Sequence, residues 1–208
     1  FGNYGLGQSM FAPSSTLKNV NSKVMRAWHD KFITADRMTI AATGVDHHSF
    51  VELADEMLGG IKRGNEEIVK KPTQYIANNI SLSTPGHEGS TTVAFAWNAP
   101  ALVAPQIVAA NVLQTAIGGG ASFSSGGPGK GMYTRLYQNV LGQHHWVENV
   151  SSFLDAYTDA GLLGIQGTIP ADAVGSFTDV VLNEVQQLPE NLSDEEIFRA
   201  KNMYKTVL

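Results

Sequence analysis

The feature that most limits how this chain can fold is a glycine-rich stretch at residues 118–131, which reads GGGASFSSGGPGKG. Seven of its fourteen residues are glycine, Phe123 is its only large apolar residue, and Lys130 carries its only charge. Glycine loses more conformational freedom on folding than other residues, which costs roughly 0.5–1 kcal/mol relative to alanine inside a helix or strand. A plain connector between packed elements needs only a few turn residues. The stretch therefore favours a long loop with a function.

The residues of this stretch leave two interpretations open, a flexible surface linker and a loop whose bare backbone approaches a ligand closely. The second is favoured because Phe123 and Pro128 interrupt the glycines and because strong helical patterns flank the stretch on both sides. Backbone donors, one aromatic ring and one cation suit the binding of an extended peptide. The candidate binding residues are Gly118, Gly119, Gly120, Ser122, Phe123, Ser124, Ser125, Gly126, Gly127, Pro128, Gly129, Lys130 and Gly131.

The segments around the loop predict an α+β fold, because strands and helices are mixed and two strands form a hairpin. Residues 91–97 are patterned as a strand whose alternation places Val93, Phe95 and Trp97 on one face. Two further strands, joined by a turn with hairpin chemistry, are predicted at residues 146–157 and 162–169. The helices predicted here are at residues 103–117, at residues 132–141, from Pro170 to just before Pro189, and after a capping box of Ser193 and Glu196.

The first sixty residues predict a helix, a strand and a second helix. In order, the predicted elements are a helix from Asn21 or Ser22 to about Phe32, a buried strand at Arg37–Thr43, and a helix that opens at the capping box of Ser49 and Glu52 and ends at Gly59.

A domain boundary is predicted between residues 61 and 79, where charge density rises, periodicity is lost and Pro72 follows two lysines. We expect residues 1–60 to be the last part of one domain, 61–79 to be a linker with a weak strand near 76–82, and 80–208 to form most of a second domain. The sequence starts without methionine and stops inside a helical pattern, so we expect it to be part of a longer polypeptide.

Composition and motifs exclude several functional classes. The net charge of −5 argues against a nucleic-acid binder, the absence of cysteine excludes thiol and disulfide chemistry, and no apolar run approaches a membrane span. A phosphate-binding loop ending at Lys130 would need a glycine at Ser124 and a hydroxyl at Gly131. No pair of the six histidines has the helical spacing of metal ligands, and no serine has the setting of a hydrolase nucleophile.

Residues 118–137 closely resemble the glycine-rich loop of the α subunits of mitochondrial processing peptidases, which belong to the pitrilysin-like (M16) family. The likeness extends over nearly the whole chain. It is less specific outside the loop, where the segments that carry it are residues 32–47, 139–141, 144–146 and 159–163. The sequence departs from the usual pattern at Ala121, where a further glycine is common.

The resemblance implies an M16 fold, in which each subunit has two similar α+β domains with mostly antiparallel sheets and packed helices. It also implies that this chain has no catalytic residue, no metal ligand and no cofactor of its own. In the family, zinc is held by the β subunit through an inverted His-x-x-Glu-His motif that this sequence does not contain. By resemblance, the loop captures or positions Arg-rich presequence peptides for the β subunit, its partner in a heterodimer.

The resemblance places such a subunit in the mitochondrial matrix or on the matrix side of the inner membrane. In some organisms these subunits are also core proteins of the cytochrome bc1 complex, respiratory complex III, whose other subunits are then partners. Three interpretations remain open: a presequence-binding α subunit, a structural core protein without processing activity, and an active M16 zinc protease whose motif lies outside this sequence.

Overall fold

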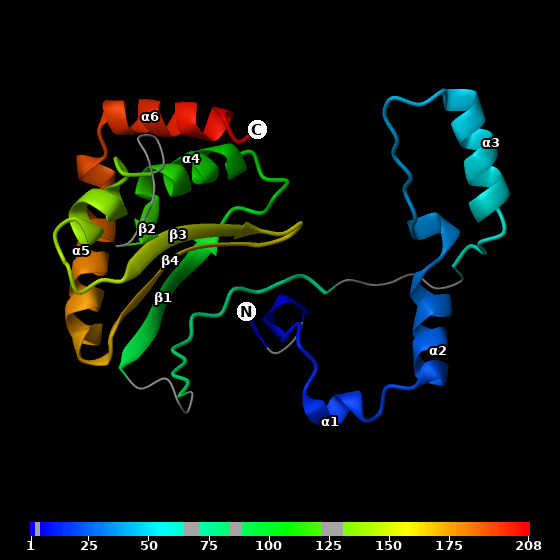
Figure 1. Cartoon of the computed structure of the whole chain (residues 1–208), viewed down its shortest axis with the longest axis horizontal. Coiled ribbons are helices and arrows are strands. Elements are labelled where there is room, and N and C mark those ends of the chain that lie inside the picture. Colours follow the sequence, from blue (N-terminus) through cyan, green and yellow to red (C-terminus); the bar gives the residue numbers. More distant parts are fainter. Residues whose placement is uncertain (3–4, 65–70, 84–88, 122–130) are drawn as a thin grey trace. The chain divides into compact units, whose positions relative to one another are not determined.

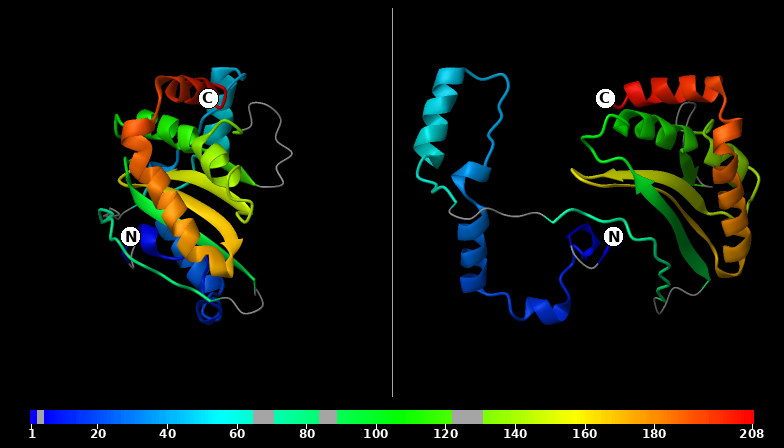
Figure 2. Two further views of the ribbon diagram at one scale, coloured as in Figure 1. Left: turned by 90° about the vertical axis from the view of Figure 1, so that its left-hand side faces the viewer. Right: turned by 180° about the vertical axis from the view of Figure 1, so that it is seen from behind.

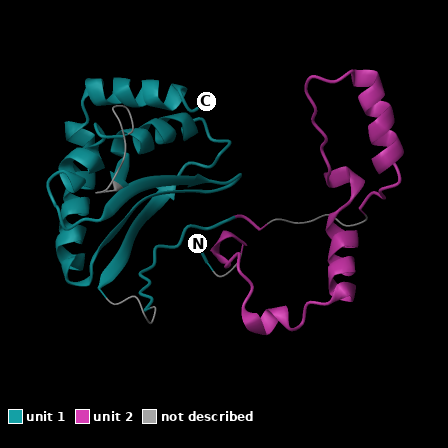
Figure 3. Cartoon of the chain, in the orientation of Figure 1, with its two compact units in different colours: residues 1–2, 73–208 teal, residues 3–72 magenta. Residues whose placement is uncertain are grey.

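The computed structural model describes residues 1–2, 5–64, 71–83, 89–121 and 131–208 (Figure 1). The chain divides into two compact units, which are described separately below (Figure 3). One unit is Asn3–Pro72, and the other is Thr73–Leu208 together with Phe1–Gly2. The predicted loop belongs to the second unit.

The second unit is built on a four-stranded antiparallel sheet with strand order β1-β4-β3-β2. The strand predicted at residues 91–97 is confirmed, and so is the hairpin, although its first strand begins at Asn149 and not at residue 146. Phe95 on β1 and Ser152 on β3 both lie opposite Ile165 on β4, and Gly120 on β2 lies opposite Val150. The strands are β1 (Ser90–Ala99), β2 (Gly119–Ala121), β3 (Asn149–Ala156) and β4 (Gly161–Pro170).

Helices cover one face of this sheet. They are α4 (Ile107–Ile117), the π-helical segment η3 (Leu136–Leu141), α5 (Val174–Asn191) and α6 (Asp194–Lys205). Helix α5 crosses the sheet, while α4 and α6 lie side by side (Figures 1 and 2). The core forms where the covered face meets them, with Val150, Ile165, Ile169, Leu136, Val140, Phe177 and Val181 buried. Val93, Phe95 and Trp97 pack against this core, as their shared strand face predicts.

Several helix boundaries differ from the predicted ones. Helix α4 starts four residues later than expected, because two successive turns, closed by the N–H groups of Ala104 and Ile107, precede it. The helix expected at residues 132–141 starts at Leu136, because residues 131–134 form a turn at the base of the loop.

The two prolines of the α5 region do not mark the helix ends that the sequence predicts. Pro170 ends β4 in extended backbone rather than starting a helix, and α5 begins at Val174. The fixed φ of proline suits the end of a strand as well as the first turn of a helix, so sequence alone does not separate the two. Pro189 lies inside the last turn of α5, where its missing N–H removes only one helical hydrogen bond.

The unit Asn3–Pro72 contains α1 (Ser14–Leu17), α2 (Ser22–Phe32) and α3 (His47–Leu58). Helix α2 has its predicted bounds, and the Asn21 side chain accepts hydrogen bonds from two backbone N–H groups of its first turn. Helix α3 is capped by Asp46, whose carboxylate accepts the N–H of Ser49, so the predicted capping box is wrong.

The buried strand predicted at residues 37–43 is also wrong. These residues join no sheet within the described part of the chain, and Ile40 is half exposed. The weak strand expected at residues 76–82 is likewise absent from the described sheet, and Ile80 and Leu82 are exposed. A strand needs a neighbour for its backbone hydrogen bonds, and neither segment pairs with another strand among the described residues. No helix among the described residues is long and apolar enough to cross a membrane.

Candidate functional site

The structure describes the two ends of the predicted loop. Gly118 follows the last turn of α4, Gly119 and Gly120 belong to β2, and Gly131 begins the turn that leads to η3. The other predicted binding residues lie outside the described residues; they are Ser122, Phe123, Ser124, Ser125, Gly126, Gly127, Pro128, Gly129 and Lys130.

The first end of the loop requires glycine for both conformation and space. The φ angles of Gly118 (60°) and Gly119 (136°) lie in a region that residues with side chains rarely adopt. A Cβ atom on Gly118 would overlap the side chain of Thr134, and one on Gly119 would overlap the carbonyl of Val150. The chain therefore passes from α4 into β2 through a close approach that only glycine permits.

Ser152 on β3 holds this first end against the sheet. Its backbone N–H donates to the carbonyl of Gly118 at 2.8 Å, and its hydroxyl lies 2.9 Å from that carbonyl and 2.9 Å from the carbonyl of Gln114. The Gln114 amide donates in return to the carbonyl of Ser152 at 3.1 Å. The C-terminal end of α4 is thus fixed to the middle of β3.

Thr134 joins the second end of the loop to the first. Its N–H and its hydroxyl both donate to the carbonyl of Gly131, at 3.0 and 2.5 Å, and its hydroxyl oxygen accepts the N–H of Gly119 at 3.1 Å. A Cβ atom on Gly131 would lie 3.2 Å from the carbonyl oxygen of Gly119, so the two ends are adjacent. Residues 119 and 131 are therefore tied together through one buried threonine.

Arg135, the next residue, anchors the second end to α5 and α6. Its Nε donates to the Glu184 carboxylate at 2.5 Å, and its Nη1 donates to the Asn191 carbonyl at 3.0 Å and to the Glu196 carboxylate at 3.1 Å. Asn139 donates to the other oxygen of Glu184 at 3.0 Å. Arg135 and Glu184 are both buried, so this network connects the loop base rigidly to the helical layer.

Glu196 links this network to the start of α6. It accepts the N–H and hydroxyl of Ser193 at 2.9 and 2.8 Å, which completes the predicted capping box. Burial, the largest single influence, acts to raise the pKa of Glu196, but the bonds from Ser193 and the charge of Arg135 together hold that pKa below its usual value of 4.5. The folded state therefore favours the ionised carboxylate.

This lowered pKa predicts a loss of stability in acid. A carboxylate whose pKa is lower in the folded state stabilises that state above its unfolded pKa, near 4.5, and loses this effect as pH falls through the folded pKa. The free energy of unfolding of the wild type should therefore exceed that of Glu196→Gln at about pH 7, and the difference should shrink by about pH 3. Urea denaturation at both pH values measures it. A pH-independent difference would contradict the assignment.

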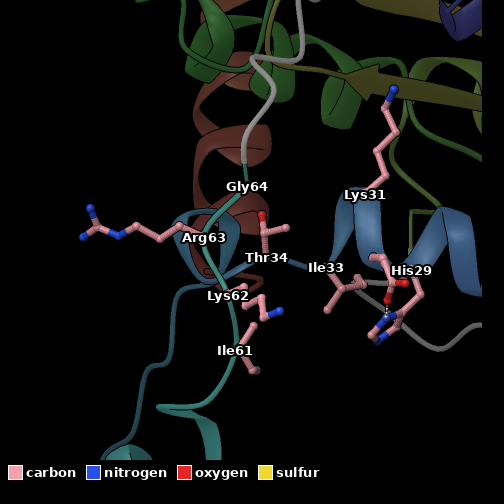
Figure 4. A pocket seen from close by; sticks show the side chains of 9 residues that line it. His29, Lys31, Ile33, Thr34, Ile61, Lys62, Arg63 and Gly64 are labelled. Carbon is pink, nitrogen blue, oxygen red and sulfur yellow. Dashed lines mark hydrogen bonds and ion pairs between the residues drawn. The ribbon is translucent and has the colours of Figure 1, made fainter.

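Three hollows among the described residues lie away from the loop base. One, of about 660 Å³, lies in the unit Asn3–Pro72 between the end of α2 and residues 61–64 (Figure 4). Its cations do not converge, since the side chains of Lys31 and Arg63 extend in different directions in Figure 4. A second, of about 620 Å³, lies in the same unit between residues 40–42 and α3. The third, of about 500 Å³, is an apolar groove between α4 and α6. None of them gathers groups suited to a chemical reaction, and no three acidic or histidine side chains among the described residues could hold a metal ion.

Residues 19–204 match the model of the peptidase M16 inactive domain. The chain belongs to the M16 peptidase family. It is 32% identical over 204 residues to the mitochondrial-processing peptidase subunit alpha of Solanum tuberosum, covering 97% of this chain and 40% of the relative. It is 30% identical over 217 residues to the subunit alpha of Homo sapiens, covering 98% and 41%. The chain thus spans about two fifths of the length of these relatives.

The fold matches a chain in the solved structure titled "Complex III2 from Candida albicans, Inz-5 bound", with a TM-score of 0.77 and 20% identity over 94% of this chain and 46% of that one. The predicted resemblance to the α subunits and the predicted M16-type α+β fold are both confirmed.

Sequence reasoning missed the residues that hold the loop base, although two of them carry a signal. Ser152 is a polar residue on the strand face that also carries Val150 and Leu154. Glu184 is an acid within the apolar stripe of α5, because it lies seven residues, or about two turns, after Phe177 and three residues after Val181. A polar group at a core-facing position is buried only when it has hydrogen-bond partners, so each of these positions predicts a partner elsewhere in the chain.

Proposed function

We propose that the protein to which this chain belongs acts as the non-catalytic α subunit of a mitochondrial processing peptidase. Its loop at residues 118–131 holds Arg-rich presequence peptides while the partner β subunit, which binds zinc, cleaves them. The observation that carries the proposal is a glycine-rich loop whose ends are fixed to a packed core, in a chain that is similar to α subunits over nearly its whole length.

The chemistry of the loop supports peptide binding. A backbone free of side chains offers its N–H and C=O groups to an extended peptide, as in other modes of main-chain recognition. The net charge of −5 favours a cationic ligand, and targeting presequences are Arg-rich and amphipathic. A base tied at both ends limits the entropy that the loop must lose when it binds.

The proposal extends to the place and the assembly of the protein. We place it in the mitochondrial matrix or on the matrix side of the inner membrane, as a heterodimer with the β subunit. Within the chain, we assign residues 1–60 to the end of one M16 domain, 61–79 to a linker and 80–208 to most of a second domain. The similarity to α subunits over nearly the whole chain favours a non-catalytic subunit over an active zinc protease.

A second candidate function is that of a structural core protein of respiratory complex III that does not process presequences. It is favoured by the fold match to a chain of a complex III structure. Under this alternative, other subunits of the cytochrome bc1 complex are the partners, and the loop has no peptide to bind.

Deletion of residues 122–130 distinguishes the two functions. The deletion keeps the described loop base, so the full-length chain should still assemble with the β subunit and unfold at the wild-type temperature. We expect presequence peptides to bind about tenfold more weakly, which corresponds to about 1.4 kcal/mol, with a matching rise in KM. Fluorescence anisotropy with a labelled presequence and cleavage assays measure both. Unchanged binding and cleavage would favour the structural core protein.

A further inference from the structure

We propose that Thr134 is a positioning residue for peptide capture: its hydroxyl clasps the two ends of the glycine-rich loop and so sets how the loop presents its backbone. This inference rests on the proposed function of the loop. The contacts that carry it are made by described residues, namely Thr134, Gly119 and Gly131.

The hydrogen bonds of Thr134 show why a hydroxyl is needed. Its oxygen donates to the carbonyl of Gly131 and accepts the N–H of Gly119, so one atom serves both ends of the loop. A hydroxyl is the smallest side-chain group that donates and accepts at once. A methyl group in its place would remove both bonds and leave the N–H of Gly119 without this partner.

The clasp is itself immobilised. Thr134 is buried, and its Cβ and Cγ2 atoms fill the space that a side chain on Gly118 would occupy. Its neighbour Arg135 is bound to Glu184 and Glu196 on two different helices. The position of Thr134 is therefore fixed by the core, and its hydroxyl holds the two loop ends at that position.

A fixed base has a specific effect on binding. When the two ends of a loop are held together, fewer loop conformations are accessible, and less entropy is lost on binding a peptide. Loss of the clasp should therefore weaken the affinity for the peptide without changing the chemical step. Because the zinc-bearing β subunit performs that step under the proposed function, kcat should stay constant while KM rises.

The test compares Thr134→Val, which loses the hydroxyl, with Thr134→Ser, which keeps it, in the full-length chain assembled with the β subunit. Thr134→Val should raise Kd and KM for a presequence peptide about three- to tenfold, the range expected for one net hydrogen bond, with kcat unchanged. Thr134→Ser should match the wild type. Thr178→Val on α5 is the matched control, because Thr178 donates its hydroxyl to Val174 within an exposed part of the helix.

The loop deletion separates failure of this inference from failure of the proposed function. If the deletion weakens binding and Thr134→Val does not, the inference about Thr134 is wrong and the proposed function is retained. If neither variant changes binding, both the proposed function and the inference about Thr134 are wrong. In the deletion background, Thr134→Val should have no further effect on Kd, and an additive loss would indicate general damage and overturn the inference.

A further variant covers the case in which valine does not fit. Thr134→Ala removes the hydroxyl without placing a methyl group near the carbonyl of Gly131, and it should show the same rise in KM. If Ser also weakens binding, the lost methyl group and not the hydroxyl is responsible, which would overturn the inference. Failure of both the Val and Ala chains to assemble would assign Thr134 to folding and would also overturn it.

Discussion

Replacement of Arg135 by methionine is expected to lower the free energy of unfolding by about 3–5 kcal/mol, the range for breaking a buried ion pair by removing one partner. Arg135 and Glu184 are both buried, and their side chains meet at 2.5 Å. Methionine matches the length of the arginine stem but leaves the Glu184 carboxylate with Asn139 as its remaining donor among the described residues. The loss arises because a buried charge without its counter-charge is strongly penalised.

The matched control for this variant is Arg199→Met on α6. Arg199 forms an ion pair with Glu195 at 2.8 Å, but the Glu195 side chain is 80% exposed. Exposed pairs contribute up to about 1 kcal/mol, so this variant should cost far less. The double variant Arg135→Met/Glu184→Gln should recover part of the loss, because it removes the uncompensated carboxylate. Urea denaturation followed by tryptophan emission measures all three, and equal costs for Arg135 and Arg199 would contradict the network.

Strands β1, β3 and β4 could be predicted because their signals are local, whereas β2 lies within the stretch predicted as a loop. Alternation over residues 90–99 and turn chemistry between β3 and β4 depend on neighbours within a few positions. The same alternation identified the buried face, since Val93, Phe95 and Trp97 all pack on the core. A period of two places residues on faces without any knowledge of the partner strand.

The wrongly predicted elements are those whose structure depends on contacts with residues distant in the chain. Residues 37–43 have the composition of a buried strand, but a strand forms only against a neighbour, and no described segment pairs with them. Asp46 and Ser49 both have side chains suited to capping a helix. In the structure the capping residue is Asp46, three residues before the predicted Ser49. Helix ends are the least certain part of a helix assignment, and a local pattern alone does not decide which of two capping residues is used.

The position of the candidate loop could be predicted, whereas the groups that hold it could not. Glycine content is visible in the sequence, and the positive φ angles at Gly118 and Gly119 explain part of it. The bonds of Ser152 to Gly118 and of Arg135 to Glu184 join residues 34 and 49 positions apart. A single sequence shows that a polar residue lies on an apolar face, but it does not show which distant group satisfies it.

Replacement of Phe177 by alanine is expected to lower the free energy of unfolding by about 3–5 kcal/mol, the range for removing a large buried aromatic side chain. Phe177 is fully buried and lies between two aromatic partners, with ring centroids 6.4 Å from Phe95 and 6.5 Å from Trp146. Its ring also fills the notch left by Gly167 on β4, where a Cβ atom would overlap it. Alanine would leave a cavity at the centre of the contact between α5 and the sheet.

The control is Phe198→Ala on α6, because Phe198 is 64% exposed and substitutions at exposed positions usually change stability by about 0.5 kcal/mol or less. Phe177→Leu should cost less than Phe177→Ala, since leucine retains part of the apolar volume. Urea denaturation compares the three variants, and the emission of Trp146 should change with Phe177 because the two rings are in contact. If Phe177→Ala cost no more than Phe198→Ala, α5 would not pack on the face of the sheet that carries Phe95, and the loop base would lose the helical layer that supports it through Glu184.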